Sequence, residues 1–321
     1  MKLKRILFTI FLLFNFLKVA AQDLEFTQFY ANPIYLNPAM AGSHGCPRVA
    51  MNYRNQWPSL SGSYVSYAAS YDQYFSNVSG GLGLILVNDV QAKTINTTSG
   101  SLLYSYHAPI GRKWTLMFGA KASMTQKSLD WSKLTFGDMI DPRKGFIYKS
   151  GDVPRQNGVT YFDASAGFLV FNKMFNFGVA ANHLNQPNES MIGNQDDRLP
   201  MRLTAHASYN HHLGKKSKYT NSTSIMPSVI YTYQNGFWQL NLGTYVKYNK
   251  MTFGVWYRSL DAFVMTVGIN TGTFKIGYSY DITVSKLGNQ YSGGSHELSL
   301  GMNFNCRPKP QKFRKLSCPS F

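Results

Sequence analysis

The chain has 321 residues, of which 44% are hydrophobic, 15% aromatic and 15% charged. Its formal net charge is +17, from 32 basic and 15 acidic residues, which favours anionic neighbours. The basic residues are scattered rather than gathered on one helix, so nucleic acid is excluded as a partner, and anionic lipid or an acidic protein is expected instead.

The first 21 residues have the pattern of a secretory signal peptide. Three basic residues precede an apolar run over residues 6–17, and Val19 and Ala21 occupy the small-residue positions before a cleavage site at Gln22. This site has no cysteine, so a lipid anchor is not expected. We predict an exported protein.

Residues 22–47 form a series of turns, because two Asn-Pro steps and a Gly-Ser pair interrupt them and proline lacks a backbone donor. Their apolar and aromatic side chains need packing partners, so we expect an ordered segment. A loose leader is the alternative, since chain termini are often disordered.

From residue 48 onward, apolar residues occupy every second position in one segment after another. Phe274, Ile276 and Tyr278, for example, alternate with Lys275 and Gly277. Successive side chains of a strand point to opposite faces, so one face of each strand meets an apolar medium and the other meets water. Alternation also explains the slightly polar mean hydropathy of −0.22, which is no argument against a membrane.

Two architectures compete to explain this pattern. A soluble sandwich would need helices or long connections to cover its edges, and we find no convincing amphipathic helix after the signal. In a transmembrane β-barrel the strands are apolar outward and polar inward, and closure leaves no unpaired backbone in lipid. We predict an all-β outer-membrane β-barrel of about 14 antiparallel strands over residues 48–305. Residues 22–47 would form a lumen plug or a periplasmic cap, and residues 306–321 a basic periplasmic tail.

The predicted strands run over residues 48–57, 63–75, 80–90, 97–108, 113–128, 160–171, 175–184, 199–210, 223–233, 237–248, 251–258, 261–270, 273–284 and 295–305. The long connections 129–159, 185–198 and 285–294 fall at the same end of such a barrel, as external loops do. The basic connection 211–222 is the exception, because it lies at the end with the short turns.

Five stretches carry a resemblance to a known family: QFYANPIYLNPAMAGS (28–43), RNQWPSLSGSYVSYAAS (54–70), WYRSLDAF (256–263), FKIGYSYDITVSKLG (274–288) and GSHELSLGMNF (294–304). In this order they resemble the PorP/SprF family of type IX secretion outer-membrane proteins, over essentially the whole mature chain. The resemblance implies a non-enzymatic barrel accessory to type IX secretion and gliding. Such a barrel would hold or help export a surface adhesin, by its C-terminal domain, and link it to periplasmic machinery.

Two groups of residues are candidates for sites. We predict six determinants of partner contact: Tyr30, Asn32, Asn37, Pro38, Arg54 and Trp57. The alternative is that the Asn-Pro steps only shape turns and that the other residues stabilise the barrel wall. Four charged residues of the last hairpin are expected to meet in the lumen or at its outer mouth: Asp281, Lys286, His296 and Glu297. Lumen ion pairs are routine, so a structural role is favoured over ligand binding for this group.

The three cysteines make an odd count in an oxidising compartment. In a closed barrel the first and last strands are neighbours, which brings Cys46 near Cys306 and makes a disulfide between them a candidate. Pairing of Cys306 with Cys318 and free thiols are the alternatives.

Enzymatic functions are poorly supported, and we predict no catalytic residue, cofactor or metal. The seven histidines show no metal-site spacing, and DASAG at residues 163–167 lacks the first glycine of a nucleophile elbow. A passive channel for small solutes is the alternative function, because a plugged barrel of this size would also suit it. A soluble β-protein of the export pathway is a third interpretation.

Overall fold

The structure is a computed structural model that describes residues 23–141, 143–148, 150–151, 158–191, 196–213, 223–285 and 288–304. The predicted signal peptide, residues 214–222 of the basic connection, and the predicted C-terminal tail lie outside these residues.

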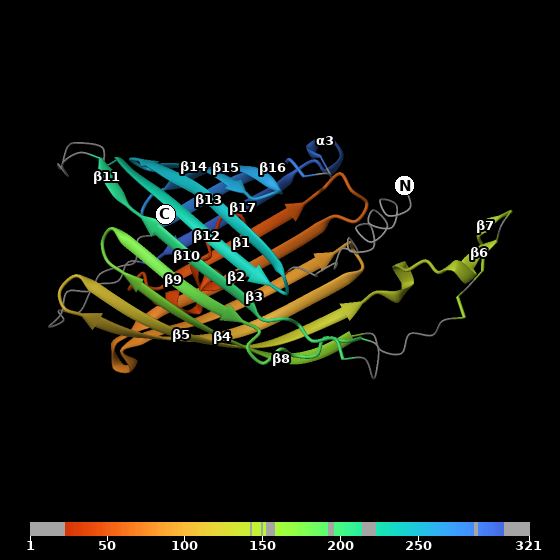
Figure 1. Cartoon of the computed structure of the whole chain (residues 1–321), viewed down its shortest axis with the longest axis horizontal. Helices are drawn as coiled ribbons and strands as arrows, with labels where there is room; N and C mark the ends of the chain where they lie inside the picture. Colours follow the sequence, from red (N-terminus) through yellow and green to blue (C-terminus); the bar gives the residue numbers. More distant parts are fainter. Residues whose placement is uncertain are drawn as a thin grey trace, which may run out of the picture.

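The strands close into an antiparallel barrel, as the alternation predicts (Figure 1). One sheet of 15 strand elements begins at β10 (Arg202–Tyr209) and ends at β11 (His211–Leu213), and both of these pair with β12 (Thr223–Gln234). β10 and β11 are therefore two halves of one strand, which leaves 14 strands and no open edge in the described sheet. The break coincides with Pro227 on β12, which lies between the residues that pair with β10 and those that pair with β11 and has no N–H to donate.

The remaining barrel strands are β1 (Arg48–Gln56), β2 (Tyr64–Phe75), β3 (Gly80–Gln91), β4 (Ile95–Ile110), β5 (Trp114–Leu129), β8 (Gly158–Phe171), β9 (Phe175–Asn182), β13 (Phe237–Tyr248), β14 (Met251–Arg258), β15 (Ala262–Asn270), β16 (Phe274–Thr283) and β17 (Ser295–Asn303). Every predicted strand is present. The bounds differ from the predicted ones by at most three residues, as at the start of β10.

Short elements lie in the connections and in the N-terminal segment. These are the helices α2 (Pro33–Leu36) and α3 (Asn289–Ser292) and the 3-10 turns η1 (Pro38–Met40), η2 (Ser76–Val78), η3 (Trp131–Lys133) and η4 (Gly137–Met139). Among the described helices, none has the length and apolarity to cross a membrane. A separate hairpin, formed by β6 (Ile140–Asp141) and β7 (Gly145–Phe146), projects away from the barrel (Figure 1).

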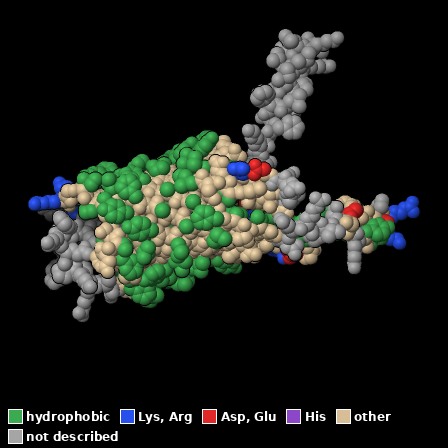
Figure 2. Space-filling model, turned by 90° about the horizontal axis from the view of Figure 1, so that it is seen from below, with side chains coloured by type: hydrophobic (Ala, Val, Ile, Leu, Met, Phe, Trp, Pro, Cys, Tyr) green, Lys and Arg blue, Asp and Glu red, His purple; other side chains and the backbone are tan. Residues whose placement is uncertain are grey.

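The outer wall of the barrel is apolar, whereas the inner wall is largely polar. On β14, Phe253 and Val255 are about half exposed, at 47% and 57%, whereas Thr252 and Trp256 are buried. Hydrophobic side chains cover much of the visible wall between the two ends (Figure 2). This is the surface that lipid covers in a transmembrane barrel.

The connections differ in length between the two ends of the barrel. The longest ones, 130–157, 183–201 and 284–294, lie at one end, which we call the long-loop end (Figure 1). Turns such as 111–113 and 172–174 join the strands at the other end, the short-turn end. The predicted grouping of the long connections at one end is therefore confirmed.

Candidate functional site in the barrel lumen

The N-terminal segment, residues 23–47, lies against the inward-facing side chains of the barrel. Asp23 Oδ2 is 2.9 Å from Nε2 of His183, which follows β9 at the long-loop end. Gly42 donates its N–H to Asp72 at 2.8 Å, near the short-turn end of β2. The segment therefore runs along the lumen from the long-loop end to the short-turn end, where β1 begins.

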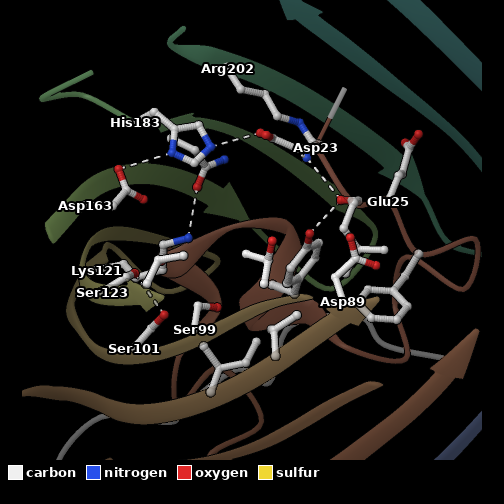
Figure 3. Close-up of a pocket in the computed structure, with 18 of the residues that line it drawn as sticks. Asp23, Glu25, Asp89, Ser99, Ser101, Lys121, Ser123, Asp163, His183 and Arg202 are labelled. Carbon is white, nitrogen blue, oxygen red and sulfur yellow. Dashed lines mark hydrogen bonds and ion pairs between the residues drawn. The ribbon is translucent and has the colours of Figure 1, made fainter. Parts of the chain in front are cut away.

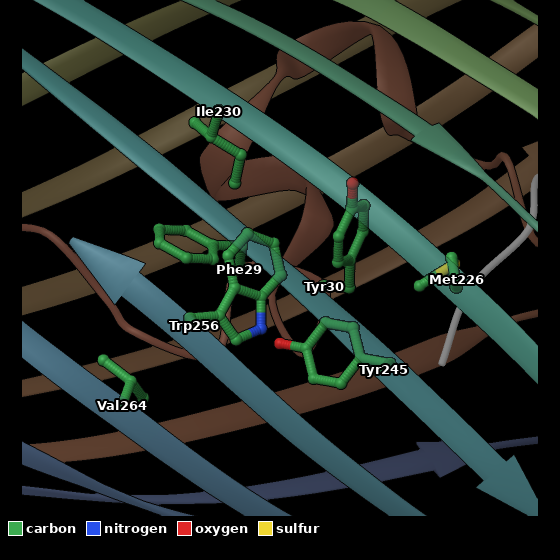
Figure 4. Packing of buried hydrophobic residues seen from close by; sticks show 7 residues of the cluster. All are labelled: Phe29, Tyr30, Met226, Ile230, Tyr245, Trp256 and Val264. Atoms are coloured by element: carbon green, nitrogen blue, oxygen red, sulfur yellow. The ribbon is translucent and has the colours of Figure 1, made fainter. Parts of the chain in front are cut away.

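Aromatic packing holds the middle of this segment. The ring of Phe29 lies 5.1 Å from that of Trp256, which lies 5.3 Å from that of Tyr245 (Figure 4). Phe29 is 6% exposed and Trp256 only 1%. Trp256 is the bulky residue on the otherwise polar face of β14, and its position is explained by this contact. Each such aromatic pair contributes roughly 0.5–1.5 kcal/mol beyond area burial.

Two inward glycines let the segment approach the wall closely. A Cβ at Gly119 on β5 would overlap the backbone of Ala39, and one at Gly81 on β3 would overlap the backbone of Ala41. The wall therefore accommodates the turn η1 only because side chains are missing at these positions.

Two arginines and two carboxylates form a buried group that we call the polar seat. It consists of Arg54 on β1, Arg258 on β14, Asp281 on β16 and Glu297 on β17, all at most 4% exposed. Asp281 Oδ2 lies 2.9 Å from Arg54 Nη2 and 3.2 Å from Arg258 Nη1. The four charges balance, which offsets the cost of burying them.

The N-terminal segment completes the polar seat. Glu297 accepts the backbone N–H of Thr27 at 2.6 Å and that of Gln28 at 3.2 Å. The Thr27 hydroxyl donates to Asp281 at 2.8 Å and accepts from both arginines. The seat thus ties the segment to four strands around the junction of the first and last strands.

Asn37 anchors the segment to the opposite wall. Its Nδ2 donates to the carbonyls of Phe168 at 3.0 Å and Val179 at 3.3 Å, and lies 3.2 Å from Nε2 of His206. Its Oδ1 accepts the N–H of Ala39 at 2.9 Å and caps η1. The Asn-Pro step therefore shapes a turn and also binds the wall.

At the long-loop end, Asp23, Asp163, His183 and Arg202 form a group that we call the mouth cluster (Figure 3). Besides its bond to Asp23, His183 has Nδ1 3.1 Å from Asp163 Oδ1, an ion pair rather than an aligned hydrogen bond. Arg202 Nη1 lies 3.8 Å from Asp23. The backbone of His183 is left-handed, with φ of 57°, which costs energy for a residue other than glycine.

The two carboxylates make the imidazole of His183 cationic. Burial disfavours its charged form, but the contacts with Asp163 and Asp23 outweigh burial and raise the pKa of His183 to about 9. Burial also raises the pKa of Asp23, but His183 and Arg202 outweigh this effect and lower it to about 2. Both groups are therefore charged at neutral pH.

A cavity of about 210 Å³ adjoins the mouth cluster, between the N-terminal segment and the wall. Carboxylates, a lysine and hydroxyls line part of it, namely Glu25, Asp89, Lys121, Ser99, Ser101 and Ser123 (Figure 3). This volume holds only a small solute. Among the described residues, no three metal-binding side chains gather into a metal site.

The comparison with protein families identifies the family of this barrel. The family described as type IX secretion system membrane protein PorP/SprF matches residues 18–302, which is most of the chain. The chain belongs to the PorP/SprF family. It is therefore an outer-membrane β-barrel protein associated with type IX secretion, as the resemblance of its sequence motifs implies.

Solved structures match this PorP/SprF chain at low identity, and no curated protein matches it. Omp33 from Acinetobacter baumannii shares 9% identity with a TM-score of 0.45, covering 82% of this chain and 100% of Omp33. The toluene transporter TodX from P. putida shares 10% with a TM-score of 0.47, covering 84% and 93%. The CymD monoaromatic hydrocarbon channel shares 11% with a TM-score of 0.46, covering 87% and 94%.

The residues predicted to contact partners lie mostly inside this PorP/SprF barrel. Tyr30, Asn32, Asn37, Pro38 and Arg54 are buried in contacts with the wall or within the polar seat. Trp57 is half-buried in the loop after β1, at the long-loop end, where its ring packs edge-on against Tyr64 at 5.6 Å. The first five are therefore internal contacts, and the role of all six in partner binding stays a prediction.

Two of the three described members of the predicted charged cluster meet in the lumen. Asp281 and Glu297 belong to the polar seat. His296 points to the outer face, where Tyr278 contacts its Nδ1 at 2.8 Å, because neighbours on a strand point to opposite sides. Lys286 lies outside the described residues.

Cys46 forms a disulfide, which excludes a free thiol at this position. Phe304 donates its N–H to the carbonyl of Pro47 at 3.0 Å, so the end of β17 lies beside Cys46 as expected for a closed barrel. Cys306 and Cys318 lie outside the described residues, and the pairing of Cys46 with Cys306 stays a prediction.

Sequence reasoning overlooked Arg258, Thr27, Asp23 and His183. Arg258 carried a usable signal, because it is a charge at an inward position of an alternating strand, as Asp281 is. The other three carried none, since they lie outside the strands and their partners are far away in the sequence.

Proposed function

We propose that this PorP/SprF protein is a non-enzymatic, closed barrel that serves as a platform for type IX secretion. It holds or helps export a secreted adhesin at the cell surface, by the adhesin's C-terminal domain, and links it to periplasmic and gliding machinery. The observation that best supports this role is the N-terminal segment, which we interpret as a plug of the lumen.

The contacts of the segment are those of a fixed plug. Thr27 and Gln28 bond to the buried polar seat, and Phe29 packs in an aromatic core. Asn37 bonds to the opposite wall. Contacts of this kind on both walls favour a plug over a loose leader or a periplasmic cap. A barrel occupied in this way suits a platform better than a solute channel.

The projecting hairpin is our candidate contact for the secreted protein. In outer-membrane barrels the long loops face outside and the short turns face the periplasm, so we expect β6 and β7 at the cell surface. Phe146, Ile147 and Tyr148 are 63%, 51% and 56% exposed there. Clustered apolar side chains outside the lipid band mark protein-interaction sites.

This role is tested by changing the hairpin to Phe146→Ser, Ile147→Ser and Tyr148→Ser. The amount of type IX secreted protein retained on the cell surface should fall, while the purified barrel keeps its heat-modifiable migration. Leu260→Ser with Tyr291→Ser is the matched control, because these residues are 80% and 73% exposed on other loops of the same end. Unchanged retention in the hairpin variant would contradict the assignment.

A passive channel for small solutes is the second candidate, and the cavity beside the mouth cluster favours it. Conductance in planar bilayers separates the two functions. The platform predicts that the intact barrel is silent and that deletion of residues 23–42 opens it. Selective flux through the intact barrel would instead support the channel.

A further inference from the structure

Acidic and basic residues are unevenly divided between the two ends of the barrel. Among the described carboxylates, only Asp72 lies in the short-turn half, and Arg48 binds it through two contacts of 2.8 and 2.9 Å. Lys and Arg side chains are visible at this end without Asp or Glu, whereas both signs are visible at the other (Figure 2). The described part of the short-turn end therefore carries net positive charge.

Four exposed cations contribute to this charge, and we call them the basic rim: Arg112, Lys113, Lys173 and Lys250. They stand on three separate turns, which follow β4, β8 and β13. None of them has a carboxylate oxygen within 4.0 Å among the described residues. Lys247 and Lys275 face the lumen at the same end.

The spacing of these charges indicates the kind of partner. The three turns are spread over the arc of the ring that runs from β4 through β8 to β14, so a single small anion cannot contact all of them. The cavity that Arg48 and Lys275 line at this end measures about 30 Å³, which is too small for a polymer chain. A broad acidic protein surface placed against this end can contact all four cations of the basic rim.

We propose that the basic rim is a docking surface for the acidic face of a periplasmic protein. The proposal rests on the proposed function for its orientation, in which the short turns face the periplasm. Complementary charge speeds association and selects the partner, and salt screens it because these side chains are exposed.

The test reverses three rim charges, Lys113→Glu, Lys173→Glu and Lys250→Glu, in the full chain held in phosphatidylcholine nanodiscs. The matched control reverses three exposed cations of the long-loop end: Lys93→Glu, Lys133→Glu and Arg198→Glu. A fluorescent deca-glutamate peptide reports binding to an acidic polypeptide. The rim variant should bind it at least about tenfold more weakly than wild type, and the control should bind like wild type. Equal binding by wild type and the rim variant would overturn the proposal.

Two further arms identify the natural partner chemistry. A photo-crosslinker is placed at Met174, which is exposed beside Lys173. In cells it should crosslink to a periplasmic protein at an acidic stretch of that protein's sequence, and the same product should be absent in the rim variant. If the rim variant lost binding only to phosphatidylglycerol vesicles, or only to peptidoglycan sacculi, the proposal would be overturned in favour of that ligand. Surface retention of the secreted protein, measured in the same cells, reports separately on the proposed function.

Discussion

The ion pairs of His183 make the stability of the barrel depend on pH in a defined direction. The pKa of His183 rises from 6.5 to about 9 on folding, and each pKa unit corresponds to about 1.4 kcal/mol. Folding therefore gains about 3 kcal/mol, which is fully present below pH 6.5 and is lost as the pH rises through 9. The lowered pKa of Asp23 arises from the same contact between Asp23 and His183, so its free energy is not added to the ~3 kcal/mol assigned to His183. That contribution is present above pH 3.8 and is lost as the pH falls through about 2.

His183→Gln removes this charge, and guanidinium unfolding in phosphatidylcholine vesicles measures the change. The free energy of unfolding should fall by about 3 kcal/mol at pH 6, and the difference from wild type should shrink between pH 8 and pH 10. His44→Gln is the control, because burial and the nearby Arg48 and Lys275 lower the pKa of His44 to about 4 and keep it neutral throughout. A difference of the same size at pH 6 and pH 10 would refute the reasoning.

Three other substitutions test the contacts of the N-terminal segment. Glu297→Gln leaves the arginines of the polar seat with one carboxylate. The free energy of unfolding in vesicles should fall by about 3–5 kcal/mol. A fall under about 1 kcal/mol would show that water enters the seat. Gly119→Val should displace the segment and raise the conductance in planar bilayers, whereas Gly100→Ala, where a Cβ makes only ordinary contacts, should stay silent. Trp256→Ala should destabilise the barrel by about 3–5 kcal/mol in the same unfolding assay, and the half-exposed Trp238→Ala should cost clearly less.

The strands could be predicted because each one carries its own two-residue period. In β14, Phe253 and Val255 face lipid and Thr252 faces the lumen, and this order is visible without knowing any neighbour. The site was harder to predict, because its contacts join residues far apart in the sequence. Thr27 meets Glu297 across 270 positions, and nothing near either residue indicates the other.

The sequence by itself determined that this chain forms a membrane barrel with apolar outer and polar inner walls. It did so because backbone pairing in lipid must be complete and alternation decides which side chains face lipid. Only the tertiary structure decided which wall residues the N-terminal segment contacts, because those partners lie far away in the sequence. Closure of the ring brings Arg54, Asp281 and Glu297 together. Thr27 can bond to Asp281 within this group only because the closed ring assembles it.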